Sequence, residues 1–159
     1  MWFIAGDEDV AGLRPVPVGL AYRVNSAPGN APVTEDLAAE LSRVIERFAR
    51  ESGFTARRPV KIEFGKGSVG HHQVGRATDI YGVEGMGIDK WKKRWDARRE
   101  RQANLGWRLY RALQTYGRWA QPYGYPIQLF GPWTREEGPW KFISDRLLAA
   151  HRDHIHVAK

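Results

Sequence analysis

Histidines gather in two short segments of this sequence. His71 and His72 are adjacent, His154 and His156 lie near the C-terminus, and His151 lies just before that second pair. The chain has no cysteine, so a metal ion could be held only by His, Asp or Glu. A single histidine is more often structural than functional, but this clustering indicates a metal site.

The first segment offers two metal ligands. His72 is followed seven residues later by Asp79, and the small residues Gly75 and Ala77 lie between them. Glycine lets the backbone pass close to a metal, and alanine packs there without blocking it. A catalytic zinc site takes three protein ligands and leaves the fourth position to water. The second segment must therefore supply a third ligand.

The second segment is expected to be a strand over residues 153–158. Alternation along a strand sends His154 and His156 to the same face, and the apolar residues between them to a core. Asp153 points away in an ideal strand, yet at the strand's start it can still reach a water on the metal. A salt bridge from Asp153 to Arg152 or Arg76 is the competing interpretation.

Together the two segments match the motifs of a known family. The pattern His-x-x-Gly-x-Ala-x-Asp, followed near the C-terminus by acid-x-x-His or His-x-His, resembles the zinc D-alanyl-D-alanine metallopeptidases, their phage endolysin relatives and the murein LD-endopeptidases. These enzymes belong to a fold group that includes lysostaphin-type enzymes and the Hedgehog signalling domain. The resemblance implies an α+β fold in which a small antiparallel sheet forms the zinc cleft and helices pack on one side.

The resemblance also implies roles for individual residues. It places one Zn²⁺ per chain on His72, Asp79 and His156, and catalytic roles on Asp153 as general base and His154 as a residue that stabilises the transition state. It implies a zinc metallopeptidase that hydrolyses peptidoglycan stem peptides or cross-links. The chain carries features of both the carboxypeptidase and the endopeptidase branches, so the scissile bond stays open. The base position holds Asp where the family usually has Glu.

The rest of the sequence predicts the elements that position these residues. Residues 1–33 are rich in proline and predict an N-terminal arm or edge strand with a short strand at 18–24, and residues 34–159 are the metallopeptidase-like domain. A helix should begin at Thr34 and end near Gly53, with an apolar stripe formed by Leu37, Leu41, Val44, Ile45 and Phe48. Further strands are expected at 58–64, 75–83 and 126–130, and helices within 88–119 and at 140–150.

Charge and hydropathy restrict the partners. The net charge of +7 favours polyanionic surroundings, although the basic stretch Lys90–Arg101 is most simply a solvated helix face. No apolar run approaches the roughly 18 residues of a membrane span, and no signal peptide is visible. We expect a monomer whose peptidoglycan substrate implies a location in the cell envelope, periplasmic or extracellular.

Two other classes of function share features with this sequence. Asp153-His154-Ile155 also resembles the start of the catalytic hairpin of His-Asn-His nucleases, but too few residues follow for the required Asn and second His, so no nucleic acid partner is expected. The other alternative is a non-catalytic zinc-bearing module that binds cell-wall or other polyanionic ligands through its basic face.

Overall fold

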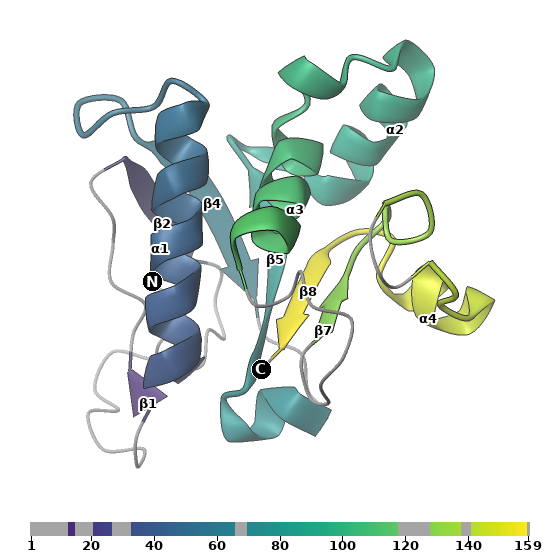
Figure 1. Cartoon of the computed structure of the whole chain (residues 1–159), viewed down its shortest axis with the longest axis horizontal. Helices are drawn as coiled ribbons and strands as arrows, with labels where there is room; N and C mark the ends of the chain where they lie inside the picture. Colours follow the sequence, from purple (N-terminus) through teal and green to yellow (C-terminus); the bar gives the residue numbers. More distant parts are fainter. Residues whose placement is uncertain are drawn as a thin grey trace.

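The chain folds around one mixed β-sheet (Figure 1). The computed structural model describes residues 13–14, 21–26, 33–65, 70–117, 128–137 and 141–158. The main sheet has the strand order β2-β4-β5-β8-β7, and β6 pairs with β5 off this path. Its strands are β2 (Tyr22–Ser26), β4 (Val60–Gly65), β5 (Ala77–Val83), β6 (Met86–Gly87), β7 (Gln128–Phe130) and β8 (Ile155–Ala158). A separate antiparallel pair consists of β1 (Leu13–Arg14) and β3 (Val33–Thr34).

Helices flank this sheet. The α-helices are α1 (Glu35–Glu51), α2 (Ile88–Arg98), α3 (Leu105–Tyr116) and α4 (Asp145–Ala150), and two short 3₁₀ helices are η1 (Gly70–Val74) and η2 (Arg101–Ala103). Figure 1 shows α1 and α3 side by side in front of the sheet. None of the described helices is both long and apolar enough to cross a membrane.

The expected α+β class is confirmed, but the sheet is not wholly antiparallel. β2 runs parallel to β4, with Tyr22 opposite Val60. Two parallel neighbours require a crossover connection, and α1 lies between them in the sequence to provide it. The strands around the histidines are antiparallel, because β5 pairs with both β4 and β8, and β8 with β7.

Helix α1 forms where the apolar spacing predicts it. Thr34 is its N-cap, and the Thr34 hydroxyl accepts a hydrogen bond from the Leu37 amide at 3.4 Å. The whole predicted apolar stripe is buried in the core. The helix ends at Glu51, and Gly53 follows with a φ of 86°, the left-handed conformation that glycine adopts at low cost.

A β-bulge interrupts β5, the strand that carries Asp79. Glu63 is opposite Gly82, but Phe64 is opposite Ile80, so Tyr81 is an extra residue on β5. Ile80 is fully buried in the core beneath the helices. Asp79 alternates to the opposite side of the sheet, where the Tyr81 hydroxyl contacts it.

The other predicted elements differ mainly at their ends. The terminal strand begins at Ile155 rather than Asp153, so His154 precedes it. The last helix begins at Asp145, because the Ser144 hydroxyl accepts a hydrogen bond from Leu147 N at 3.2 Å and caps the helix there. The strand expected at 75–83 begins at Ala77, after η1. Most of the predicted arm over residues 1–33, and residues 118–119, 126–127 and 140 of other predicted segments, lie outside the described ranges.

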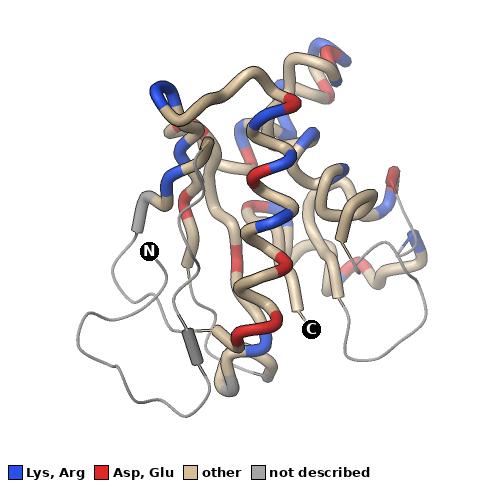
Figure 2. Tube along the Cα trace, turned by 60° about the vertical axis from the view of Figure 1, so that its left-hand side comes forward, with Lys and Arg blue, Asp and Glu red and all other residues tan. Residues whose placement is uncertain are grey.

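Charged residues on α1 are paired one turn apart. Arg50 Nη2 lies 2.7 Å from Glu46 Oε1, and Arg47 Nε lies 3.0 Å from Glu51 Oε1. Figure 2 shows basic and acidic residues interleaved along this helix. Helix α1 carries five acidic and three basic residues, in contrast to the mainly basic α2.

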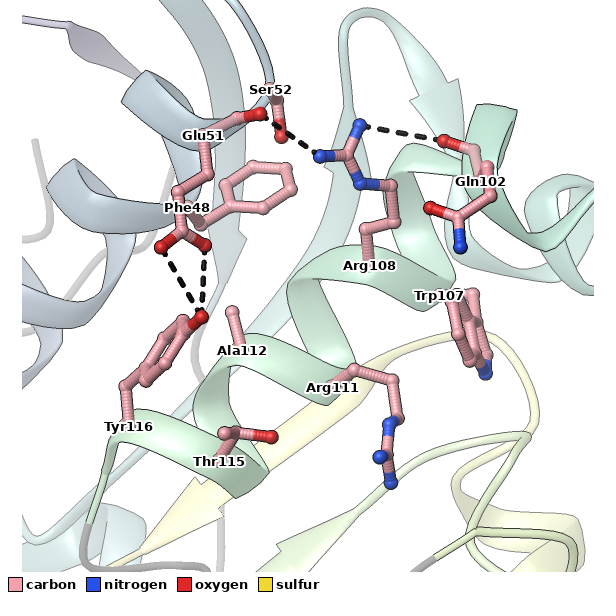
Figure 3. A pocket seen from close by; sticks show the side chains of 10 residues that line it. All are labelled: Phe48, Glu51, Ser52, Gln102, Trp107, Arg108, Arg111, Ala112, Thr115 and Tyr116. Carbon is pink, nitrogen blue, oxygen red and sulfur yellow. Dashed lines mark hydrogen bonds between the residues drawn. The ribbon is translucent and has the colours of Figure 1, made fainter.

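A pocket of about 230 Å³ lies at the joint between α1 and α3 (Figure 3). Arg108 reaches across it, with Nη2 donating to the Glu51 carbonyl oxygen at 3.1 Å. The Tyr116 hydroxyl donates to Glu51 Oε2 at 3.0 Å. Because these contacts tie the two helices together, the pocket is a packing joint between α1 and α3.

Candidate metal centre

Three elements bring His72, Asp79 and His156 together. His72 lies in η1, Asp79 in β5 and His156 in β8, and all three side chains are buried. Asp79 and His156 are directly opposite each other in the β5–β8 pairing. Their ligand atoms and that of His72 all lie within 4.8 Å of one another, so the group could hold a metal ion.

The turn between η1 and β5 explains the glycine in the motif. Gly75 has a φ of 70°, a left-handed conformation that other residues adopt at a cost. Its amide donates to the His72 carbonyl oxygen at 3.3 Å, and its own carbonyl accepts from Thr34 N at 2.9 Å. Gly75 thus lets the chain reverse after His72 and enter the strand that carries Asp79.

The spacing of the donor atoms suits a small metal ion. His72 Nε2 lies 3.5 Å from Asp79 Oδ1, and His156 Nδ1 lies 3.0 Å from the same oxygen. Two ligands about 2.05 Å from a tetrahedral zinc ion would be about 3.3 Å apart. The two distances lie on either side of this value, so the donor set of two imidazoles and one carboxylate fits such an ion.

Gln128 supports His156 from β7. His156 Nε2 lies 3.2 Å from Gln128 Oε1, which can only accept a hydrogen bond. A proton on Nε2 leaves the lone pair of Nδ1 available on the side of Asp79. Phe130 stacks on the same imidazole with ring centroids 5.9 Å apart. The orientation of this ring is therefore fixed from two sides, as metal-binding histidines require.

Burial and charge favour the protonation states that bind a metal. Burial lowers the pKa of His72 below its usual value, so this imidazole is neutral at neutral pH. Burial acts to raise the pKa of Asp79, but a hydrogen bond from protonated His156 and the charges that the three surrounding histidines carry when protonated outweigh it, so the pKa of Asp79 is lowered. A neutral imidazole and an ionised carboxylate are both able to coordinate a cation.

His154 faces the same group from the edge of β8. Its Nε2 lies 3.7 Å from Asp79 Oδ1, and its Nδ1 lies 2.8 Å from Asp153 Oδ1. Asp153 therefore contacts His154, and His154 in turn approaches the three ligands. No ion pair among the described residues joins Asp153 to Arg152 or Arg76.

Three further residues next to this group, Tyr81, His151 and Gln128, have no role predicted from the sequence. The Tyr81 hydroxyl donates to Asp79 Oδ2 at 3.5 Å, and burial together with Asp79 raises the pKa of Tyr81 to about 12, so it stays protonated. Burial lowers the pKa of His151, whose ring lies 5.0 Å from that of His154. Gln128 is the third. Because Tyr81 is two residues after Asp79, alternation along a strand could have indicated that the two side chains share a face.

Trp133, which follows β7, is fully buried and belongs to the core.

Comparisons of the chain with protein-family models, curated proteins and solved structures found no match.

Proposed function

We propose that this chain is a zinc-dependent peptidase that hydrolyses peptide bonds in peptidoglycan stem peptides or cross-links. The observation that carries the proposal is the buried group of His72, Asp79 and His156, with His154 facing it. Two imidazoles and one carboxylate form a ligand set found in catalytic zinc sites, which leave one position open. The motif resemblance supplies the substrate class, and its location in the cell envelope is proposed with it.

The three ligands would hold one zinc ion per chain. A bound zinc ion would lower the pKa of a water molecule to about 7 and polarise the carbonyl group of the scissile bond. Gln128 and Phe130 would keep His156 in its binding orientation. The Tyr81 hydroxyl would hold the second oxygen of Asp79.

His154 is the residue best placed to move the proton. The contact of 2.8 Å with Asp153 favours a proton on Nδ1, so Nε2 keeps its lone pair on the side of Asp79. His154 Nε2 takes one proton from water while the water oxygen bonds to the carbonyl carbon. It returns this proton to the amine that leaves when the carbon–nitrogen bond breaks, and the other water proton stays with the carboxyl product.

This assignment changes the role of Asp153. The resemblance implies that Asp153 is the general base, whereas the geometry favours His154 as base and Asp153 as the positioning residue that orients it. Asp153 has a side chain that is 60% exposed, compared with 13% for His154. The more buried group is the one beside the metal ligands.

Metal analysis of the purified protein tests the metal part of the proposal. We expect one zinc ion per chain, and loss of zinc from His72→Ala, Asp79→Ala and His156→Ala. His71→Ala is the matched control, because His71 is adjacent to His72 but outside the group. Iron in place of zinc, or zinc retained by all three variants, would contradict the proposal.

Digestion of purified muropeptides tests the reaction. The zinc-loaded protein should release a new amine that is detected by mass spectrometry, and His154→Ala should bind zinc but release the amine at least about 100-fold more slowly. Binding of muropeptides without cleavage, unchanged by metal removal, would instead favour the non-catalytic cell-wall module.

A further inference from the structure

A cleft with a volume of about 580 Å³ opens beside Asp153. Its walls come from α2, the turn at residues 131–137, α4 and the residues before β8. The side chains that line it include Lys92, Lys93, Glu136, Leu148, Arg152 and Asp153. This volume is in the usual range of small-ligand sites, about 300 to 1,000 Å³. It is large enough for a short peptide segment.

The cleft is connected to the metal centre through a single side-chain contact. Asp153 lines the cleft and lies 2.8 Å from His154 Nδ1. The other nitrogen of this ring lies 3.7 Å from Asp79 Oδ1. A ligand in the cleft would therefore be separated by Asp153 from His154, the proposed base, and His154 in turn faces the three metal ligands.

Three basic side chains line the cleft together with three carboxylates, of which Asp89 is the third, but among the described residues only one of the basic side chains is in an ion pair. Lys92 Nζ lies 2.6 Å from Glu136 Oε1 and 3.0 Å from Asp96 Oδ1, so its charge is compensated. Lys93 and Arg152 are exposed and form no ion pair with any residue in the part of the chain that the structure describes. Two cations in the cleft are thus available to a ligand.

We propose that this cleft binds the carboxylate-bearing part of a peptide substrate, with Lys93 and Arg152 as the cationic contacts. The proposal rests on the peptidase function and adds the subsite that orients the substrate. Arginine can bind a carboxylate through two parallel hydrogen bonds, and lysine adds a mobile point charge. Leu148 and Pro132 supply apolar surface for the peptide's carbon atoms.

The chain offers a matched pair of double variants. Lys93→Gln with Arg152→Gln removes both cations from the cleft. Lys90→Gln with Arg146→Gln removes one exposed cation from α2 and one from α4, and neither residue lines the cleft. Both variants lose two positive charges, so any general effect of net charge is the same in both.

Kinetics on two peptides test the proposal. The substrates are an acidic stem peptide and the same peptide with its side-chain carboxylates amidated. The cleft variant should raise KM for the acidic peptide about tenfold with kcat little changed, and the control should not. The proposal would be overturned if the two double variants had the same KM for the acidic peptide. It would also be overturned if the cleft variant raised KM equally for the acidic and the amidated peptide.

Equilibrium binding separates this proposal from the peptidase function. Calorimetric titration of the acidic peptide into the metal-free protein needs no turnover. Weaker binding only in the cleft variant would support the subsite even if no cleavage occurs, in which case the peptidase function alone fails. If the protein cleaves the peptide, and the cleft variant binds it with the same affinity and the same KM as the wild type, the subsite alone is overturned. Binding of a glycerol-phosphate polymer but not of the peptide would also overturn it.

Discussion

His156 lies between Asp79 and Gln128, with a different ring nitrogen facing each. Nδ1 lies 3.0 Å from Asp79 Oδ1, and Nε2 lies 3.2 Å from Gln128 Oε1. β8 is the middle strand of the β5–β8–β7 segment, so residues on both neighbours reach the same imidazole. The pairing of β8 with β5 and β7 therefore leaves Nδ1 of His156 as the nitrogen that can bind a metal.

Gln128→Leu should weaken zinc binding by about 10- to 100-fold, because the imidazole loses the acceptor that holds its proton on Nε2. Competition with a zinc chelator of known affinity measures this loss. Gln128→Glu is the control, since it keeps an acceptor at the same position and should bind zinc at least as tightly as the wild type. Equal zinc affinity in wild type and Gln128→Leu would show that this contact does not support the ligand.

The metal-free protein should become less stable as the pH falls below the ordinary histidine pKa of 6.5. Burial lowers the pKa of both His72 and His151. Between the unfolded and folded pKa values the unfolded chain binds more protons, so the free energy of unfolding falls with falling pH through this window. Each histidine can contribute at most about 1.4 kcal/mol per pH unit.

Urea unfolding in the presence of a chelator, at intervals from about pH 8 to about pH 5.5, checks this pH dependence. His151→Gln should have a shallower slope than the wild type, because one of the two titrating groups is removed. A free energy of unfolding that stays constant over the whole interval would contradict the assignment of these two buried neutral histidines.

His154→Ala should retain zinc and lower kcat by about 10²- to 10⁴-fold, the usual contribution of a general base. Asp153→Asn should also retain zinc and lower kcat, because the imidazole loses the carboxylate that fixes its tautomer. The zinc content and the pH–rate profile of each variant are measured together. If Asp153→Ala abolishes turnover while His154→Ala keeps most of it, Asp153 is the base.

The sequence predicted the parts of the site that depend on short-range patterns. Spacing alone placed His72 before a strand and Asp79 within it, and the apolar stripe from Leu37 onward predicted α1. His154 and His156 both approach Asp79, as the predicted alternation requires, although β8 itself begins at Ile155.

The remaining parts depend on contacts between distant segments. Gln128 meets His156 only because β7 pairs with β8, and no local pattern around residue 128 indicates that pairing. The parallel pairing of β2 and β4 depends on how α1 crosses the sheet. The β-bulge at Tyr81 depends on the register between β4 and β5, which no pattern within β5 indicates.

Gly65→Ala should disturb the site through Tyr81. A Cβ at Gly65 would overlap the Tyr81 ring and come within 2.7 Å of its Cδ2 atom. The Tyr81 ring also lies 5.1 Å from the ring of His154, the proposed base. A shift of the Tyr81 ring would therefore change the packing around that base. We expect a loss of about 1 to 3 kcal/mol in the free energy of unfolding, together with lower turnover.

Tyr81→Phe separates the ring from the hydroxyl group. It keeps the ring over Gly65 and removes only the donor to Asp79 Oδ2. This variant should therefore unfold at nearly the wild-type urea concentration and bind zinc less tightly. The double variant Gly65→Ala with Tyr81→Ala should be more stable than Gly65→Ala alone, because the methyl group introduced at position 65 then has space. If Gly65→Ala is as stable and active as the wild type, the close packing of Tyr81 on Gly65 does not constrain the site.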